Sequence, residues 1–214
     1  MMKLYYSLGA CSLAPHISLG ACSLAPHIVA REAGWPLDLV RVDLASHRLA
    51  DGSDYHDVNP RGQVPALELE DGSLLTEGTV IAQFLADRAL AREVMPAAGT
   101  LARYRVMQWQ SFVGAELHKS YGPLFKPALP DDARALFLAN LHEKYAWLDR
   151  HLSDQAYLTG EAFTAADAYL FTVTNWSRSV GLDLAGLARI QAFQQRVAAR
   201  PAVVEAMRAE GLRD

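Results

Sequence analysis

Two cysteines, Cys11 and Cys22, are the side chains of this sequence best suited to nucleophilic or redox chemistry. Each follows a Gly-Ala pair and precedes an apolar stretch with helical spacing, so each stands where a strand would turn into a helix. The positive end of a helix dipole lowers the pKa of a thiol and makes a thiolate available. A lone cysteine is more often a small buried hydrophobe, so the position of these thiols, and not the residue type alone, favours a reactive group.

The two cysteines belong to a repeat. Residues 7–17 (SLGACSLAPHI) recur without a change as residues 18–28, which indicates a tandem duplication of one local segment, natural or engineered. Without the extra copy the chain would hold a single cysteine. The pair is therefore no disulfide framework and fits a reducing compartment.

Either copy can supply the turn before the helix, and the sequence favours Cys22. If Cys11 took that place, Gly20 and Pro26 would fall inside the helix, at a cost of about 1 and about 3 kcal/mol. If Cys22 takes it, Pro26 stays in the first helical turn and the first copy becomes a longer loop, which costs only about 0.6 kcal/mol per doubling. A helix lengthened by about 16 Å and a swapped dimer are further alternatives.

Two more pairs of residues carry possible binding chemistry. Glu77 and Gly78 stand at the start of a predicted helix, where free backbone N–H groups bind a carboxylate and a Glu side chain meets an ammonium group. The plainer interpretation is a carboxylate that favours the helix dipole. Val64 and Pro65 stand just before a predicted strand, where a proline is ordinary.

The elements that position these residues form two groups. Residues 3–6 and 37–44 predict strands, a helix between them ends at Gly34, and Asp71-Gly72 predicts a hairpin of residues 66–70 and 73–76. A helix follows from residue 77. Beyond residue 99 the pattern is helical, with apolar positions along 101–121 and 132–152 and a capping box at Thr164. The sequence predicts an α/β domain with a mixed sheet over 1–92 and an all-α domain over 99–214.

Composition narrows the class of protein. The 214 residues carry a net charge of −4, which gives no electrostatic footprint for nucleic acid or an anionic membrane surface. The apolar runs fall short of the roughly 20 residues that a bilayer span needs, and no secretory leader is visible. We therefore expect a cytoplasmic protein with neither nucleic acid nor membrane as a partner.

Five ordered motifs make the chain resemble the beta-class (bacterial) glutathione transferases. They are the Gly-Ala-Cys-Ser-Leu-Ala turn, residues 59–67 (NPRGQVPAL), 75–78 (LTEG), 116–119 (ELHK) and 163–169 (FTAADAY). The resemblance covers the whole chain apart from the extra copy. It implies a thioredoxin-like first domain, an all-helical second domain, glutathione as cosubstrate, a small electrophile as the other substrate, and a homodimer.

The resemblance also implies roles for single residues. Gln63, Val64 and Pro65 belong to the loop that holds the glutathione backbone, with the Val64-Pro65 bond cis. Glu77 and Gly78 form the γ-glutamyl site.

The remaining roles concern the sulfur and the two ends of the site. The cysteine lies beside the glutathione sulfur, where it can form a mixed disulfide. His118 faces the cleft, and Lys119 lies near it and the dimer interface. His47 stands where the family commonly has a Lys, so we expect the glycine carboxylate of glutathione to be held more weakly.

The function predicted is transfer of the glutathione thiolate to small electrophilic or disulfide substrates, with Cys22 or Cys11 and His118 as the catalytic side chains and no metal. Two alternatives stay open. One is a glutathione-dependent thiol–disulfide reductase, which a cysteine that forms mixed disulfides suits. The other is a non-catalytic binder of glutathione or a hydrophobic ligand, inactivated by the duplication.

Overall fold

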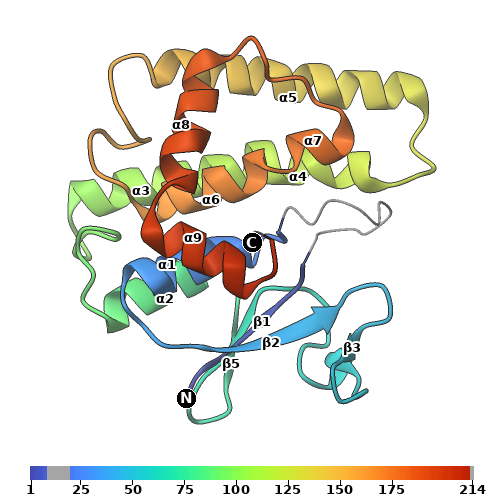
Figure 1. Cartoon of the computed structure of the whole chain (residues 1–214), viewed down its shortest axis with the longest axis vertical. Helices are drawn as coiled ribbons and strands as arrows, with labels where there is room; N and C mark the ends of the chain where they lie inside the picture. The colour runs from blue at the N-terminus through green and yellow to red at the C-terminus, as the bar shows by residue number, and fades with distance from the viewer. Residues whose placement is uncertain (9–19, 213–214) are drawn as a thin grey trace.

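The computed structural model describes residues 1–8 and 20–212, and Cys11 lies outside the described residues. A five-stranded mixed sheet in the order β3-β2-β1-β4-β5 forms one side of the molecule (Figure 1). Strands β1 and β2 are parallel, and the other three neighbouring pairs are antiparallel. The strands are β1 (Lys3–Tyr6), β2 (Asp38–Asp43), β3 (Arg48–Leu49), β4 (Ala66–Glu68) and β5 (Leu74–Thr76).

The predicted strands and the hairpin are confirmed. Gly72 has a φ of +82°, the left-handed conformation that the Asp71-Gly72 turn needs between β4 and β5. Strand β3 was missed, because it is two residues long and lies in a polar stretch that has no alternation.

Two helices cover one face of the sheet and separate it from the rest of the molecule (Figure 1). They are α1 (Leu24–Glu32), which follows Cys22, and α2 (Gly78–Arg88). The helix predicted after the cysteine turn thus begins in the second copy of the repeat. Seven of its nine residues are buried, so α1 is held by packing on both sides.

The remaining helices form a second layer of the molecule. They are α3 (Leu101–Phe112), a π-helix (Val113–His118), α4 (Lys119–Tyr121), a 3-10 turn (Gly122–Phe125), α5 (Asp131–His151), α6 (Ala165–Thr174), α7 (Ser177–Val180), α8 (Ala188–Ala198) and α9 (Pro201–Ala209). The predicted helix over 101–121 is therefore one rod interrupted by a π-helical turn. Pro123 lies in the 3-10 turn, and the chain leaves the rod before Pro127.

Helix α6 is the buried centre of this layer. Its predicted capping box is present: the Thr164 side chain and backbone N–H both donate to Asp167 at 2.8 Å. Asp167 also accepts from the backbone N–H of Leu158 at 2.8 Å. Burial raises the pKa of Asp167 to about 6, and these hydrogen bonds oppose that rise.

Helix α9 returns to the first half of the chain and lies against α1 (Figure 1). Arg200, which precedes α9, binds Glu32 of α1 through two hydrogen bonds of 2.6 and 2.8 Å. Behind them, Nδ1 of His27 lies 2.8 Å from Glu210, and both side chains are buried. The end of the described chain is thereby fixed to the helix that follows Cys22.

One apolar cluster spans the two layers, because buried residues of α1 and α2 belong to the same cluster as those of α3, α5, α6 and α8. In the described part of the chain, no helix has the length and apolar character needed to cross a bilayer.

Candidate active site

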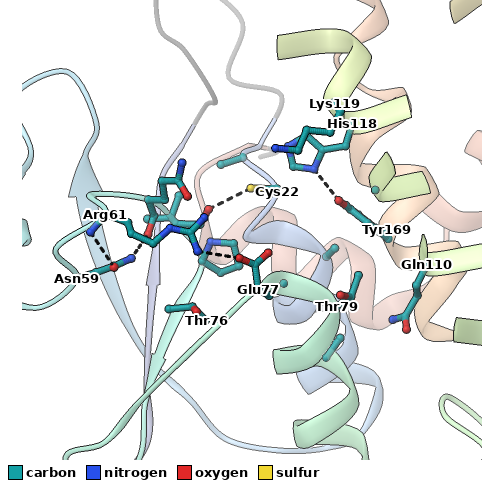
Figure 2. Close-up of a pocket in the computed structure, with 18 of the residues that line it drawn as sticks. Cys22, Asn59, Arg61, Thr76, Glu77, Thr79, Gln110, His118, Lys119 and Tyr169 are labelled. Carbon is teal, nitrogen blue, oxygen red and sulfur yellow. Dashed lines mark hydrogen bonds and ion pairs between the residues drawn. The ribbon is translucent and has the colours of Figure 1, made fainter. Parts of the chain in front are cut away.

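A pocket of about 800 Å³ opens between the sheet layer and the helical layer. Its walls come from the start of α1, the loop before β4, the start of α2, the rod from α3 to α4, and α6 (Figure 2). All the site residues named from the sequence, apart from Cys11, line it: Cys22, His47, Gln63, Val64, Pro65, Glu77, Gly78, His118 and Lys119. Residues far apart in the chain therefore meet at one place.

Cys22 lies two residues before α1, at the helix N-terminus expected for the reactive thiol. Its Sγ donates to the backbone oxygen of Val64 at 3.1 Å. Two hydrogen bonds hold the two residues that precede it. The backbone N–H of Ala21 donates to the oxygen of Ser7 at 3.4 Å, and the indole N–H of Trp176 donates to the oxygen of Gly20 at 2.8 Å.

The loop before β4 has the predicted cis bond between Val64 and Pro65. The oxygen of Gln63 accepts from the Tyr55 hydroxyl at 2.9 Å and from the Asn59 side-chain amide at 2.7 Å. These two bonds hold the loop beside Cys22. Asn59 and Tyr55 were not singled out from the sequence, although Asn59 begins the motif that includes Val64.

Glu77 has a φ of +68°, which is unusual for a residue other than glycine. Strained backbone of this kind persists where the surroundings impose it and is often found at functional sites. The carboxylate of Glu77 lies 3.0 Å from the guanidinium of Arg61, and both side chains are more than 60% exposed. Gly78 follows as the first residue of α2, where helices leave N–H groups without intrahelical partners.

His118 is the last residue of the π-helix. It lies on the helical side of the pocket, across from Arg61 and Glu77 (Figure 2). Its Nδ1 lies 2.6 Å from the hydroxyl of Tyr169, a residue of α6. Burial, together with the positive charge of Lys119, lowers the pKa of His118 to about 4, so the ring is neutral at neutral pH. Burial, and then the negative charges of Cys22 and Glu77, raise the pKa of Tyr169. The sequence motif contained Tyr169, but spacing alone could not pair it with His118.

His47 lines the pocket and has a φ of +52°. Its ring lies 4.4 Å from that of His56, and its buried Nδ1 has no hydrogen-bond partner among the described residues. Gly62 underlies both rings: an added Cβ there would lie 2.7 Å from Nε2 of His56 and 2.9 Å from the His47 ring. The glycine is therefore required for the two rings to approach the loop.

The described residues, 1–8 and 20–212, contain no group of three or more His, Cys, Asp or Glu side chains arranged to hold a metal ion. The groups that line the pocket suit proton transfer, hydrogen bonding and thiol chemistry: the Cys22 thiol, the exposed ion pair of Arg61 and Glu77, the hydrogen-bonded imidazole of His118 and the ring of His47.

Comparisons with known proteins place this pocket in context. The family model of the glutathione S-transferase N-terminal domain matches residues 20–88, and that of the C-terminal domain matches residues 131–209. The chain is 46% identical to the glutathione S-transferase GstA of Escherichia coli O157:H7, over 99% of this chain and all of that protein. It is 36% identical to the glutathione S-transferase GST-4.5 of Xanthomonas campestris, with the same coverage.

Solved structures agree. The ternary complex of BphK, a bacterial glutathione S-transferase, is 46% identical and superposes with a TM-score of 0.90, over 98% of this chain and all of that one. A sphingomonad glutathione S-transferase complexed with glutathione is 41% identical, with a TM-score of 0.88 over 98% and 99% of the two chains. A beta-class enzyme of Sphingomonas chungbukensis is 40% identical, with the same TM-score and coverage.

Proposed function

This chain belongs to the glutathione S-transferase family, and on that premise we propose that its pocket binds glutathione across Val64 and Glu77 and transfers the glutathione sulfur to a small electrophile. The chain is an enzyme with glutathione as its cosubstrate. One observation carries the residue assignments: eight described residues named from the sequence motifs, together with His47, line a single pocket.

Each part of glutathione has a matching group in the pocket. The backbone N–H and C=O of Val64 pair with the cysteinyl part in the manner of a short antiparallel strand. The backbone N–H groups at Gly78 bind the γ-glutamyl carboxylate, and Glu77 binds the adjacent ammonium group. Arg61 is already paired with Glu77, so its guanidinium adds a cation beside the Glu77 carboxylate. His47, which lines the pocket, meets the glycine carboxylate.

We propose Cys22, and not Cys11, as the thiol beside the glutathione sulfur. Two hydrogen bonds support this, the one from Cys22 to Val64 and the one from Trp176 to Gly20, and α1 begins within the second copy, two residues after Cys22. The match of the N-terminal family model begins at residue 20, which also favours the second copy. Residues 7–17 are then the inserted copy of a tandem duplication.

We further propose a cytoplasmic homodimer. The dimer rests on the resemblance to the beta-class enzymes, and large apolar side chains exposed on α2, α3 and α5 are available for such a contact. They include Val80, Leu101, Met107, Leu136 and Trp147, each at least 38% exposed. Sedimentation analysis at several concentrations tests the dimer.

We also propose that a boundary between residues 92 and 99 separates the glutathione-binding domain from the domain that receives the electrophile.

The function is tested by retention on immobilised glutathione together with turnover of a chloronitrobenzene. Retention and turnover are both expected. Retention without turnover on any electrophile or disulfide would leave a non-catalytic binder, and turnover of disulfides alone would leave a reductase.

Mass spectrometry tests which thiol is in the site. After incubation with oxidised glutathione, peptide mapping should find the adduct on Cys22, because only that thiol lies beside Val64 in the described structure. A Cys11→Ala variant is the matched control and should give the same adduct. An adduct on Cys11 alone, or loss of the adduct in Cys11→Ala, would contradict the proposal.

A further inference from the structure

His118 and Tyr169 meet at the wall of the pocket, and the contact between them determines how the His118 ring is held. Nδ1 of His118 lies 2.6 Å from the Tyr169 hydroxyl. Trp176 meets the His118 ring edge-on, with 4.8 Å between ring centroids. The histidine belongs to the rod from α3 to α4 and the two aromatic residues to α6 and its end, so two packed helical segments fix the ring.

The positions of the protons follow from the two groups. The His118 ring is neutral at neutral pH, so one of its nitrogens donates and the other accepts. The Tyr169 phenol keeps its proton, and His118 is the acceptor found for it in the described part of the chain. A phenol is also a stronger acid than a neutral imidazole N–H. The hydroxyl therefore donates to Nδ1, and the ring proton resides on Nε2.

We infer that Tyr169 is a positioning residue: its hydroxyl holds His118 in the tautomer whose Nε2–H faces the pocket and donates a hydrogen bond to the glutathione thiolate. This inference rests on the proposed binding of glutathione beside Cys22. Figure 2 shows the His118 ring between Tyr169 and Cys22, on the side where the sulfur would lie. The thiol proton leaves to solvent, and neither His118 nor Tyr169 accepts it.

The charged groups around His118 are compatible with a neutral donor. Cys22 at the start of α1 and Glu77 before α2 bring negative charge toward the pair, while Lys119 brings positive charge on the same rod. A protonated His118 would require a buried positive ring beside Lys119. A neutral ring with its proton on Nε2 supplies a donor at any pH at which glutathione is ionised, without that cost.

The test is the ionisation of bound glutathione in Tyr169→Phe. Without the phenol, Nδ1 can carry the proton, and Nε2 then turns a lone pair toward the thiolate. The ultraviolet absorbance of the thiolate, measured against S-methylglutathione as a thiol-free reference, should titrate about one pKa unit higher. Below that pKa kcat/KM should fall about tenfold, and at high pH it should approach the wild-type plateau, since one unit corresponds to a factor of ten.

Two comparisons separate positioning from structure. Tyr104→Phe removes the same hydroxyl from an exposed tyrosine of α3 outside the pocket lining and should leave the titration unchanged. His118→Gln places an amide N–H near the position of Nε2 with no second tautomer. In that background Tyr169→Phe should have no further effect on the titration, so the double-mutant cycle should show strong coupling.

A loss of rate by the same factor at every pH, or an unchanged thiolate titration in Tyr169→Phe, would overturn the inference and leave glutathione binding intact. Additive effects of the two substitutions would also overturn it. A wild-type protein that does not bind glutathione would overturn the proposed function itself. Because the absorbance needs only binding, it separates these outcomes even if the electrophile used is a poor one.

Discussion

At the scale of single residues, Glu77 is exposed, so we expect it to contribute little to folding and, in the proposed site, much to binding. Its ion pair with Arg61 is more than 60% exposed on both sides, and such pairs add little to stability. Glutathione would cover this pair and bring an ammonium group to the carboxylate. Contacts to a charged group are then stronger than neutral hydrogen bonds.

We therefore predict that Glu77→Gln raises the KM for glutathione roughly 10- to 100-fold, with little change in melting temperature. Steady-state kinetics with glutathione as the varied substrate, and thermal unfolding, measure the two effects. Glu70→Gln is the control, because Glu70 forms a similarly exposed ion pair with Arg88 outside the pocket. An equal rise in KM in both variants would contradict the assignment of Glu77.

The pKa of His118 makes a second prediction at this scale. Its folded value of about 4 lies below the ordinary 6.5, so between these values the folded state binds fewer protons than the unfolded state. The contribution of this site to stability is present above about pH 6.5 and is lost as the pH falls toward 4.

Relative to His118→Gln, the wild-type protein should lose up to ~3 kcal/mol of unfolding free energy over that range. Urea unfolding at several pH values measures it, and the NMR titration of the His118 ring should show its midpoint near 4. A midpoint near 6.5 would mean that the ring is solvated.

At the scale of elements, the regular parts of the fold were predictable and the exceptions were not. The first strand, the hairpin at Asp71-Gly72 and the capping box at Thr164 each carry a local signal in residue type or spacing. The π-helix over residues 113–118 carries none, because one wider turn leaves the apolar spacing of the rod nearly unchanged.

The site was predictable to the same degree. Motifs identified the residues that reach the pocket from turns and helix starts, such as Cys22 and Glu77. The pairings between distant elements were missed, since the contact of His118 with Tyr169 spans 51 positions in the chain and depends on how the rod turns at its π-helical segment. His47 and His56 were missed as a pair because only the left-handed Gly62 lets them meet.

The contact of Arg200 with Glu32, which we call the clamp between α1 and α9, gives a prediction at the scale of elements. Arg200 binds Glu32 through two hydrogen bonds and lies 4.2 Å from the Phe163 ring centroid, and Glu32 is only 12% exposed. Arg200→Ala should destabilise the protein by about 1–3 kcal/mol, because it leaves a mostly buried carboxylate unpaired.

Denaturant unfolding measures this loss. Arg92→Ala removes the same group from an exposed pair with Asp87 and should change stability by less than about 0.5 kcal/mol. If the two variants lost the same stability, the clamp between α1 and α9 would contribute no more to the free energy of unfolding than an exposed ion pair does.

At the scale of the whole molecule, the repeat offers an unusual experiment. Because residues 7–17 and 18–28 are identical, removing any eleven consecutive residues between 7 and 28 yields the same shortened chain. Ser7 and Ala21 are hydrogen-bonded to each other, so the chain on either side of residues 9–19 is already joined at the mouth of the pocket. The shortened protein should therefore keep the fold, the pocket and its affinity for glutathione.

Circular dichroism, thermal unfolding and glutathione affinity compare the two proteins. We expect equal affinity within a factor of about two, and a melting temperature in the shorter chain that is equal or slightly higher, since a shorter loop costs less entropy. A shortened protein that binds glutathione much more tightly would mean that the longer chain obstructs its own site.

The hydrogen bond between Ser7 and Ala21 also bears on which insertions such a chain can tolerate. The groups that recognise the cysteine turn, Trp176, Val64 and Glu210, all contact residues from Gly20 onward. These contacts hold the turn from the side of α1, so they do not depend on the number of residues between Ser7 and Gly20. We therefore expect this stretch to accept an insertion, whether a further duplication, a peptide tag or a reporter sequence, without a change in Cys22 or in the helix that follows it.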